Sequence, residues 1–187
     1  MEFETQRLIL REMRDDDFDA LHAIFADPVT MQHYPAPFDA EKTRSWILRN
    51  QTRYAELGFG LWAVVLKETG EVIGDCGLTM QSIHGQILPE IGYHIHRDHQ
   101  RRGYASEAAR ACRDYAFERL EMEAVYSYMK YTNQASSGVA IKGGMSFVEE
   151  YDDPVNVRTC VYRITRADWE NLKAQERRFS VDEEALE

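Results

Sequence analysis

The chain has 187 residues, of which 44% are hydrophobic and 29% are charged, and its formal net charge is −10. This length and composition are typical of one globular domain, and the acidic balance disfavours a nucleic-acid-binding surface. No run of about 18 apolar residues is present, so we expect no membrane-spanning helix. Residues 1–12 are charged and lack the apolar block of a signal peptide, so we expect a cytoplasmic protein.

Hydrophobic periodicity predicts strands where apolar residues alternate or run together, and helices where they recur every three to four residues. Turn and capping residues, such as prolines 28, 35 and 37 and the pair Gly143-Gly144, separate these segments. In chain order we predict a strand over 5–13, helices over 15–25 and 39–56, strands over 61–66, 71–80 and 88–96, a helix over 103–120, a strand over 124–130, a helix over 133–142, strands over 145–151 and 157–164, and a helix over 167–178.

This order of elements predicts the fold class. Three consecutive strands after two helices, followed by alternating helices and strands, indicate an α/β protein with a mixed, mostly antiparallel sheet of about seven strands and helices on both faces. We see no internal repeat or linker, so we predict a single domain over residues 1–187. Its core would cover about 4–178, and residues 179–187 would form an acidic, solvated tail.

The three cysteines could indicate disulfides or a zinc site, and a cluster of histidines could indicate a metal site, but we disfavour both interpretations. Cys76, Cys112 and Cys160 are odd in number, widely spaced and flanked by apolar residues, so we expect buried free thiols rather than disulfides or a zinc site. His94, His96 and His99 include two residues on one strand face, but no carboxylate or cysteine completes a ligand set. We therefore expect no metal.

The segment QRRGYA, residues 100–105, lies between a predicted strand and a predicted helix. Unpaired amide groups at a helix start, together with the helix dipole, attract anions. Gly103 and Ala105 would let phosphate oxygens approach the backbone, and Arg101 and Arg102 add positive charge. The patterns of a P-loop and of a Rossmann dinucleotide site are both absent. The segment predicts a phosphate site, although an ordinary basic turn before a surface helix would look the same.

The pattern Q-x-x-G-x-A after a strand resembles the coenzyme A pyrophosphate loop of the GNAT acetyltransferases. Further segments resemble the RimJ/RimL-like branch of that family in the same order, and together they cover most of residues 4–165. These segments are ETQRLILREM, EVIGDCGL, PEIGYHIHRDHQRRGYASEA, Asn133 to Ser136, and KGGMSF from residue 142. The resemblance implies a GNAT-like fold and an N-acetyltransferase that uses acetyl-CoA.

In this family the strand before the loop pairs with the pantetheine arm, and its backbone N–H groups stabilise the oxyanion that forms on the thioester carbonyl. The resemblance therefore assigns the cofactor site to two backbone segments and one side chain. The residues so assigned are Tyr93, His94, Ile95, His96, Arg101, Arg102, Gly103, Tyr104, Ala105, Ser106 and Asn133.

The same resemblance suggests acid and base groups for direct attack of an amine on the thioester. Glu90 matches an acidic position of the branch and is the candidate general base, with His94 and His84 as weaker candidates; an exposed strand carboxylate is the plainer reading. Many GNAT members place a tyrosine near the position of Ala140, which puts a tyrosine acid in doubt here. The branch has N-x-x-S instead, so Ser136 is the candidate acid, with Asn133 beside it. Helix capping explains both residues equally well, and Tyr131 is a weaker substitute.

The acceptor would be a primary amine, either of a small molecule or of a protein N-terminus, selected by loops 28–40 and 81–88. Dimers are common among such enzymes, so a homodimer fits the resemblance. Two other functions stay open at this point. One is a non-catalytic acyl-CoA-binding sensor or partner module, and the other is a regulator that binds ATP or GTP at the same anion loop, although the chain lacks a P-loop lysine.

Overall fold

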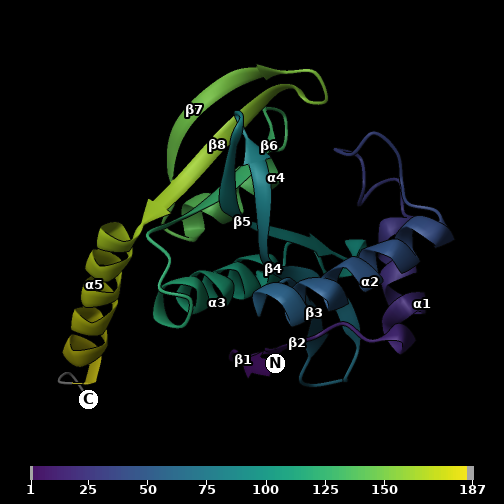
Figure 1. The fold of residues 1–187 in the computed structure, drawn as a ribbon. Helices are drawn as coiled ribbons and strands as arrows, with labels where there is room; N and C mark the ends of the chain where they lie inside the picture. Colours follow the sequence, from purple (N-terminus) through teal and green to yellow (C-terminus); the bar gives the residue numbers. More distant parts are fainter. Residues whose placement is uncertain (1, 185–187) are drawn as a thin grey trace.

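A computed structural model of the chain describes residues 2–184, with side chains through residue 178 (Figure 1). Eight strands form one sheet in the order β1-β2-β3-β4-β5-β6-β8-β7. The strands are β1 (Glu2–Glu4), β2 (Leu8–Arg11), β3 (Leu61–Leu66), β4 (Val72–Ile83), β5 (Gln86–Ile95), β6 (Ala124–Lys130), β7 (Ser146–Asp153) and β8 (Val157–Thr165). The helices are α1 (Phe18–Phe25), α2 (Ala40–Leu57), α3 (Tyr104–Glu118), α4 (Gln134–Lys142) and α5 (Arg166–Glu184).

The predicted fold class is confirmed, because the sheet is mixed, mostly antiparallel and covered by helices. It has eight strands rather than about seven. The additional strand, β1, has only three residues, which is too short to show a periodic pattern, and it pairs with β2. The predicted strand over 5–13 is shortened to β2 because a turn precedes it, in which Thr5 N donates to Leu8 O at 2.9 Å.

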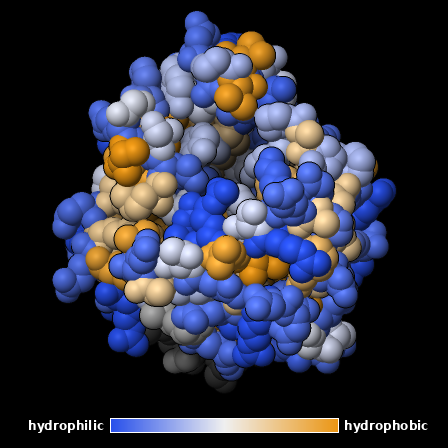
Figure 2. Space-filling model, turned by 45° about the vertical axis from the view of Figure 1, so that its right-hand side comes forward, coloured by the Kyte–Doolittle hydropathy of each residue, from blue (hydrophilic) through white to orange (hydrophobic). Residues whose placement is uncertain are grey.

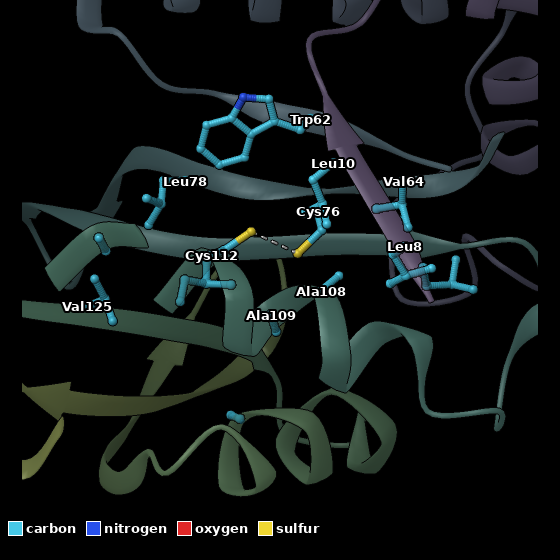
Figure 3. Packing of buried hydrophobic residues seen from close by; sticks show 14 of the residues in the cluster. Leu8, Leu10, Trp62, Val64, Cys76, Leu78, Ala108, Ala109, Cys112 and Val125 are labelled. Carbon is cyan, nitrogen blue, oxygen red and sulfur yellow. Dashed lines mark hydrogen bonds between the residues drawn. The ribbon is translucent and has the colours of Figure 1, made fainter. Parts of the chain in front are cut away.

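Strand β3 separates two hydrophobic layers, since all six of its residues are buried. Its alternate residues Trp62, Val64 and Leu66 belong to the larger core cluster, which includes the apolar face of α3. Leu61 and Ala63 belong to the other cluster, which is built with α1 and α2. Figure 3 shows the larger cluster, with Cys76 and Cys112 facing each other at its centre. Helices therefore cover both faces of the central strands.

The long hairpin β4–β5 corrects one expectation from the sequence. An acceptor loop is expected over residues 81–88, but the two strands pair without interruption to Ile83 opposite Gln86. Only His84 and Gly85 form the turn, and both have positive φ angles, 46° and 79°. A two-residue turn with two positive φ angles matches the twist of the flanking strands, so pairing continues through residues that the sequence pattern leaves ambiguous.

The sheet opens between β5 and β6. These strands are parallel, and their register contains a single pair, Glu90 with Tyr126. Beyond Glu90, β5 remains paired with β4 whereas β6 pairs along its whole length with β8. The strands thus diverge in front of the residues that lead into α3. This divergence creates the space in which the candidate site lies.

The C-terminal helix extends further than predicted. Helix α5 continues from Arg166 through Glu184, so the backbone of most of the expected acidic tail is helical. Residues 185–187 of that tail lie outside the described residues. Among the described residues, no helix is both long and apolar enough to cross a membrane.

Candidate active site

A cleft of about 980 Å³ occupies the gap between β5 and β6. At one end it is lined by the start of α3 and the first turns of α4, and at the other by the loop before α2 and by the inner residues of β4, β5 and β6. The face shown in Figure 2 is hollowed in its upper half and carries hydrophilic and hydrophobic residues side by side. The start of α3 and the residues expected to receive an acceptor therefore line the same cleft.

The backbone amides at the start of α3 are available to a ligand. Gly103 is the N-cap of this helix with φ 84°, and Arg101 also has a positive φ of 60°. Within the described chain, the N–H groups of residues 101–106 find no protein acceptor; the first amide of this helix that does is Glu107 N, which donates to Gly103 O at 3.0 Å. Unsatisfied amides at a helix N-terminus favour an anion, and this end of α3 lines the cleft.

Arg7 holds this segment in place, a role that the sequence pattern does not indicate. Its guanidinium donates to the carbonyl of Arg102 at 3.0 Å and to Glu107 at 2.7 Å, and it lies 4.4 Å from the ring centre of Tyr104. The Arg102 side chain is exposed and does not line the cleft, whereas Arg101 does line it. Of the two arginines expected at the cleft, only Arg101 lines it. The segment is held in place by Arg7, which is nearly 100 positions away in the chain.

Strand β5 presents only alternate amides to the gap, so only some of residues 93–96 can offer their backbone N–H groups to a ligand there. His94 N donates to the Asp75 carboxylate at 3.0 Å and His96 N donates to Ile73 O at 2.8 Å, so both face β4. The expectation that these two amides serve an oxyanion or the cofactor arm is wrong, because successive residues of a strand point their amides to opposite edges. The backbone N–H groups of Tyr93 and Ile95 therefore point toward the open edge of β5.

Glu90 lies on the wall of the cleft at the last paired position of β5 and β6. Its carboxylate accepts a hydrogen bond from Thr79 Oγ1 at 3.1 Å. Burial raises the pKa of Glu90 to about 7, and the Thr79 bond opposes part of that rise. Gly92 lies beside it, and a Cβ there would stand 3.3 Å from the carboxylate, so the glycine leaves room for it. A carboxyl group with a pKa near neutrality suits a general base.

Asn133 and Ser136 lie together at the start of α4, and both line the cleft. Asn133 is the N-cap, and its Oδ1 accepts the hydrogen bond of Ser136 N at 3.1 Å. The Ser136 hydroxyl is 2.8 Å from the hydroxyl of Tyr93, which also donates to Ser136 O at 2.9 Å. The capping role of Asn133 is therefore present in the structure. Tyr93 contributes a side chain to the site, although the sequence pointed only to its backbone.

The histidine candidates have different environments. His94 is buried between Asp75, at 2.8 Å from Nδ1, and Tyr34, at 2.7 Å from Nε2. His84 is exposed at the hairpin tip, 3.1 Å from Glu149, and does not line the cleft. Among the side chains that the structure describes, those of residues 2–178, no three His, Cys, Asp or Glu side chains come together as metal ligands.

Neither Ala140, which stands near the position of the family's tyrosine, nor the substitute Tyr131 lines the cleft. Ala140 is buried within α4 and does not line the cleft. Tyr131 lies outside the cleft, with the Arg158 guanidinium 4.3 Å from its ring centre. The tyrosine hydroxyl that does contact Ser136 is that of Tyr93, on β5. Only tertiary contact brings these two residues together, since they are 43 positions apart.

Comparison with known proteins agrees with this geometry. The family model described as "Acetyltransferase (GNAT) domain" matches residues 7–146. The chain is 38% identical over 157 residues to the uncharacterized protein YkkB of Bacillus subtilis (strain 168), covering 82% of this chain and 91% of that protein. It is 34% identical over 149 residues to the uncharacterized N-acetyltransferase p20 of Bacillus licheniformis, covering 78% and 82%. A crystal structure of an acetyltransferase from Agrobacterium tumefaciens str. C58 is 32% identical, with a TM-score of 0.74 and coverage of 88% and 94%.

The chain belongs to the GNAT acetyltransferase family, because the family model matches residues 7–146, which is well over half of the 187-residue chain. The protein is an acetyltransferase, and the cosubstrate of this fold is acetyl-CoA. The comparisons give no support to a non-catalytic sensor. The amides of α3 and the opened edge of β5 fit such a cosubstrate, because one end of the cleft offers donors for a diphosphate and the next segment offers an unpaired strand edge.

Proposed function

We propose that this acetyltransferase transfers the acetyl group of acetyl-CoA to a primary amine. The diphosphate would be held by the amides of residues 101–106 and by Arg101, and the pantetheine arm would lie along the open edge of Tyr93 and Ile95. The observation that carries this proposal is the set of helix-start amides without a protein acceptor, at the end of a cleft that leads to Glu90. Gly103 has no side chain to block an approach to these amides.

Glu90 is proposed as the general base. The amine nitrogen forms a bond to the thioester carbon, the carbon–sulfur bond breaks, and the proton lost from nitrogen passes to the Glu90 carboxylate directly or through water. The pKa of about 7 for Glu90 supports this role, because the group is largely ionised just above neutral pH and is still basic enough to accept a proton. An α-amine, whose ordinary pKa is about 7.7–8.0, needs less help than a lysine amine at about 10.4.

The backbone of β5 would stabilise the negative charge that develops on the carbonyl oxygen, and the first turn of α4 would stabilise the charge on the departing sulfur. The N–H groups of Tyr93 and Ile95 face the edge where the carbonyl oxygen would develop negative charge, and each such donor is typically worth about 3–4 kcal/mol. The Ser136 hydroxyl would turn from Tyr93 to donate a hydrogen bond to the departing thiolate, and the thiolate takes its proton from water. Asn133 supports this arrangement by fixing the backbone of Ser136.

The acceptor belongs to the class of primary amines, either a small molecule or a protein N-terminus. A place in the RimJ/RimL-like branch, supported by the opening strand and by the N-x-x-S segment, is part of this proposal, as is a cytoplasmic location. The residues that would select the acceptor lie in the loop before α2, which lines the cleft with Tyr34 and Pro35 among others, and on the inner faces of β4 and β6. A homodimer remains a proposal from the family resemblance.

Binding of CoA to the variant Gly103→Glu tests the proposed site. A glutamate there places a side chain and a negative charge at the unpaired amides, so CoA affinity measured by calorimetry should fall by at least about 100-fold, equivalent to about 2.7 kcal/mol. The matched control is Gly58→Glu: Gly58 ends α2 with a similar φ of 76°, has open space where a Cβ would stand and lies outside the cleft. Both variants carry the same backbone strain. Equal CoA affinity in the two variants would refute the assignment of this loop.

A further inference from the structure

A buried chain of hydrogen bonds runs from β4 to the loop that borders the cleft. Asp75 is fully buried, and its Oδ2 accepts from Trp46 Nε1 at 2.9 Å. Its Oδ1 accepts from the His94 backbone N–H at 3.0 Å and lies 2.8 Å from His94 Nδ1. On the other side of the ring, His94 Nε2 is 2.7 Å from the hydroxyl of Tyr34. The catalytic roles proposed above use none of these side-chain contacts.

The chemistry of the partners fixes the direction of these bonds. The Trp46 indole and the His94 backbone amide can only donate, so both oxygens of Asp75 act as acceptors. A carboxylate can only accept, so the bond between His94 Nδ1 and Asp75 Oδ1 is donated by the Nδ1–H group. In the neutral form of this imidazole, Nε2 carries a lone pair, and the Tyr34 hydroxyl donates to it. The Tyr34 oxygen is left with lone pairs only.

Tyr34 is held at the cleft wall by more than this one bond. Its ring contacts His94 and Phe38, with centroid separations of 5.2 and 6.1 Å. The loop is anchored on both sides of it, because Met31 and Phe38 are buried in the second core cluster and Phe38 N donates to Phe25 O at 2.8 Å. Tyr34 itself is 43% exposed. The hydroxyl is therefore preorganised on an exposed ring.

Tyr34 and Glu90 lie in the same cleft and influence each other. Glu90 and His94 are on the same face of β5, since they are four residues apart on one strand. Burial, together with the negative charges of Glu90 and Asp75, raises the pKa of the Tyr34 phenol well above its usual value. The phenol is therefore protonated at physiological pH, and its hydroxyl lies 2.7 Å from His94 Nε2, to which it donates a hydrogen bond. Two acceptor groups, a carboxylate and a phenol oxygen, therefore line the same cleft.

We propose that Tyr34, oriented by His94 and Asp75, is a recognition residue for the acceptor amine and accepts a hydrogen bond from one of its N–H groups. This inference rests on the proposed acetyl transfer and specifies how the same cleft selects its acceptor. A primary amine has more than one N–H bond, so Glu90 takes one proton while Tyr34 orients another. His94 and Asp75 act through Tyr34 and are positioning residues.

The hydrogen-bond direction is tested by NMR of the ¹⁵N-histidine-labelled protein at pH 7, with the His94 resonances assigned by the variant His94→Gln. The expected result is one neutral tautomer, with a proton on Nδ1 and an unprotonated Nε2. The variant Tyr34→Phe should shift the Nε2 resonance, and Tyr131→Phe, which alters a tyrosine outside the cleft, should not. An Nε2–H tautomer or a doubly protonated ring would overturn the proposal, because Tyr34 would then point its own proton into the cleft.

Kinetics with acetyl-CoA and a panel of spermidine, an aminoglycoside, an amino-acid amide and a short peptide with a free N-terminus provide the second test. For the amine that reacts best, Tyr34→Phe should raise the amine KM about 3- to 10-fold, as expected for one lost hydrogen bond. The KM for acetyl-CoA and kcat should stay within about twofold, and Tyr131→Phe should change none of them. An unchanged amine KM in Tyr34→Phe would contradict the proposal. If no amine of the panel were acetylated, that result would instead contradict the proposed function. The NMR measurement would still decide the direction of the hydrogen bond between Tyr34 and His94.

Discussion

Individual residues of β5 have different environments because the strand borders a gap in the sheet. Glu90, Gly92 and His94 share one face, and Tyr93 lies on the other, where its hydroxyl reaches α4. Burial without a cationic partner at hydrogen-bond distance raises the pKa of Glu90, whereas Gly92 leaves space beside its carboxylate. One short segment can therefore supply a base on one face, a hydroxyl contact on the other and backbone donors at its edge.

The pH dependence of activity should report on Glu90. A base acts in its ionised form, so kcat/KM for the amine should rise with pH through about 7, the value to which burial raises this pKa. The variant Glu90→Gln should lower kcat/KM by about 10²- to 10⁴-fold and remove this step from the profile. In a second variant, Thr79→Val, the hydrogen bond that lowers the pKa of Glu90 is absent, so the step should move to higher pH. A wild-type profile in Glu90→Gln would exclude the proposed base.

Ser136 offers a second test at the level of one side chain. The variant Ser136→Ala keeps the backbone N–H that Asn133 caps, so α4 should be unaffected. Loss of a hydrogen bond to a charged thiolate corresponds to about 1.5–3 kcal/mol, so kcat should fall about 10- to 150-fold. The Kd for CoA, measured by calorimetry, should remain within about twofold. A loss of CoA affinity equal to the loss in kcat would assign Ser136 to binding rather than to stabilisation of the leaving thiolate.

At the level of elements, α3 connects the site to the rest of the molecule. Its N-terminus carries the unpaired amides, and its buried Arg113, only 2% exposed, donates to Gly143 O at the end of α4 at 2.8 Å. The same guanidinium pairs with Asp114, which accepts from Trp169 Nε1 at 2.8 Å and thereby contacts α5. One arginine thus links three helices, and it fixes α4 with Ser136 at a set distance from the cofactor end of the cleft.

The variant Arg113→Ala should lower the free energy of unfolding by about 1–3 kcal/mol, because it leaves the Gly143 carbonyl without its donor, whereas Asp114 keeps Trp169 and Lys173. Urea unfolding followed by circular dichroism would measure this loss. Arg110→Ala is the matched control, since Arg110 is exposed on the same helix and its replacement should change stability by no more than about 0.5 kcal/mol. Equal stability of the two variants would show that the buried arginine does not hold the helices together.

At the level of the whole molecule, two of the three thiols are protected by the core. Cys76 on β4 and Cys112 on α3 are fully buried, with their sulfur atoms 3.6 Å apart, as Figure 3 shows. Burial raises the pKa of the Cys76 thiol, which further suppresses its reactivity. Cys160 on β8 is half-buried. The prediction of free thiols from the sequence is confirmed, and that of full burial holds for two of them.

Thiol titration with an aromatic disulfide reagent should therefore detect one group in the native protein and three after unfolding in urea. The variant Cys160→Ser should leave the native protein unreactive, because the other two thiols are reached only when the sheet separates from α3. Reaction of two or three thiols in the native state would mean that this part of the core opens far more readily than its packing indicates.

The sequence by itself determined the order of elements and the mixed sheet, because apolar periodicity and turn residues are local signals, and it indicated the family through the resemblance of several segments in the same order. It also located Glu90, Asn133 and Ser136. It did not determine where the hairpin β4–β5 turns, which amides of β5 are unpaired, or that Tyr93 meets Ser136 and Asp75 orients Tyr34 through His94. Those properties depend on strand register and on contacts between residues far apart in the chain, and only the tertiary structure fixes them.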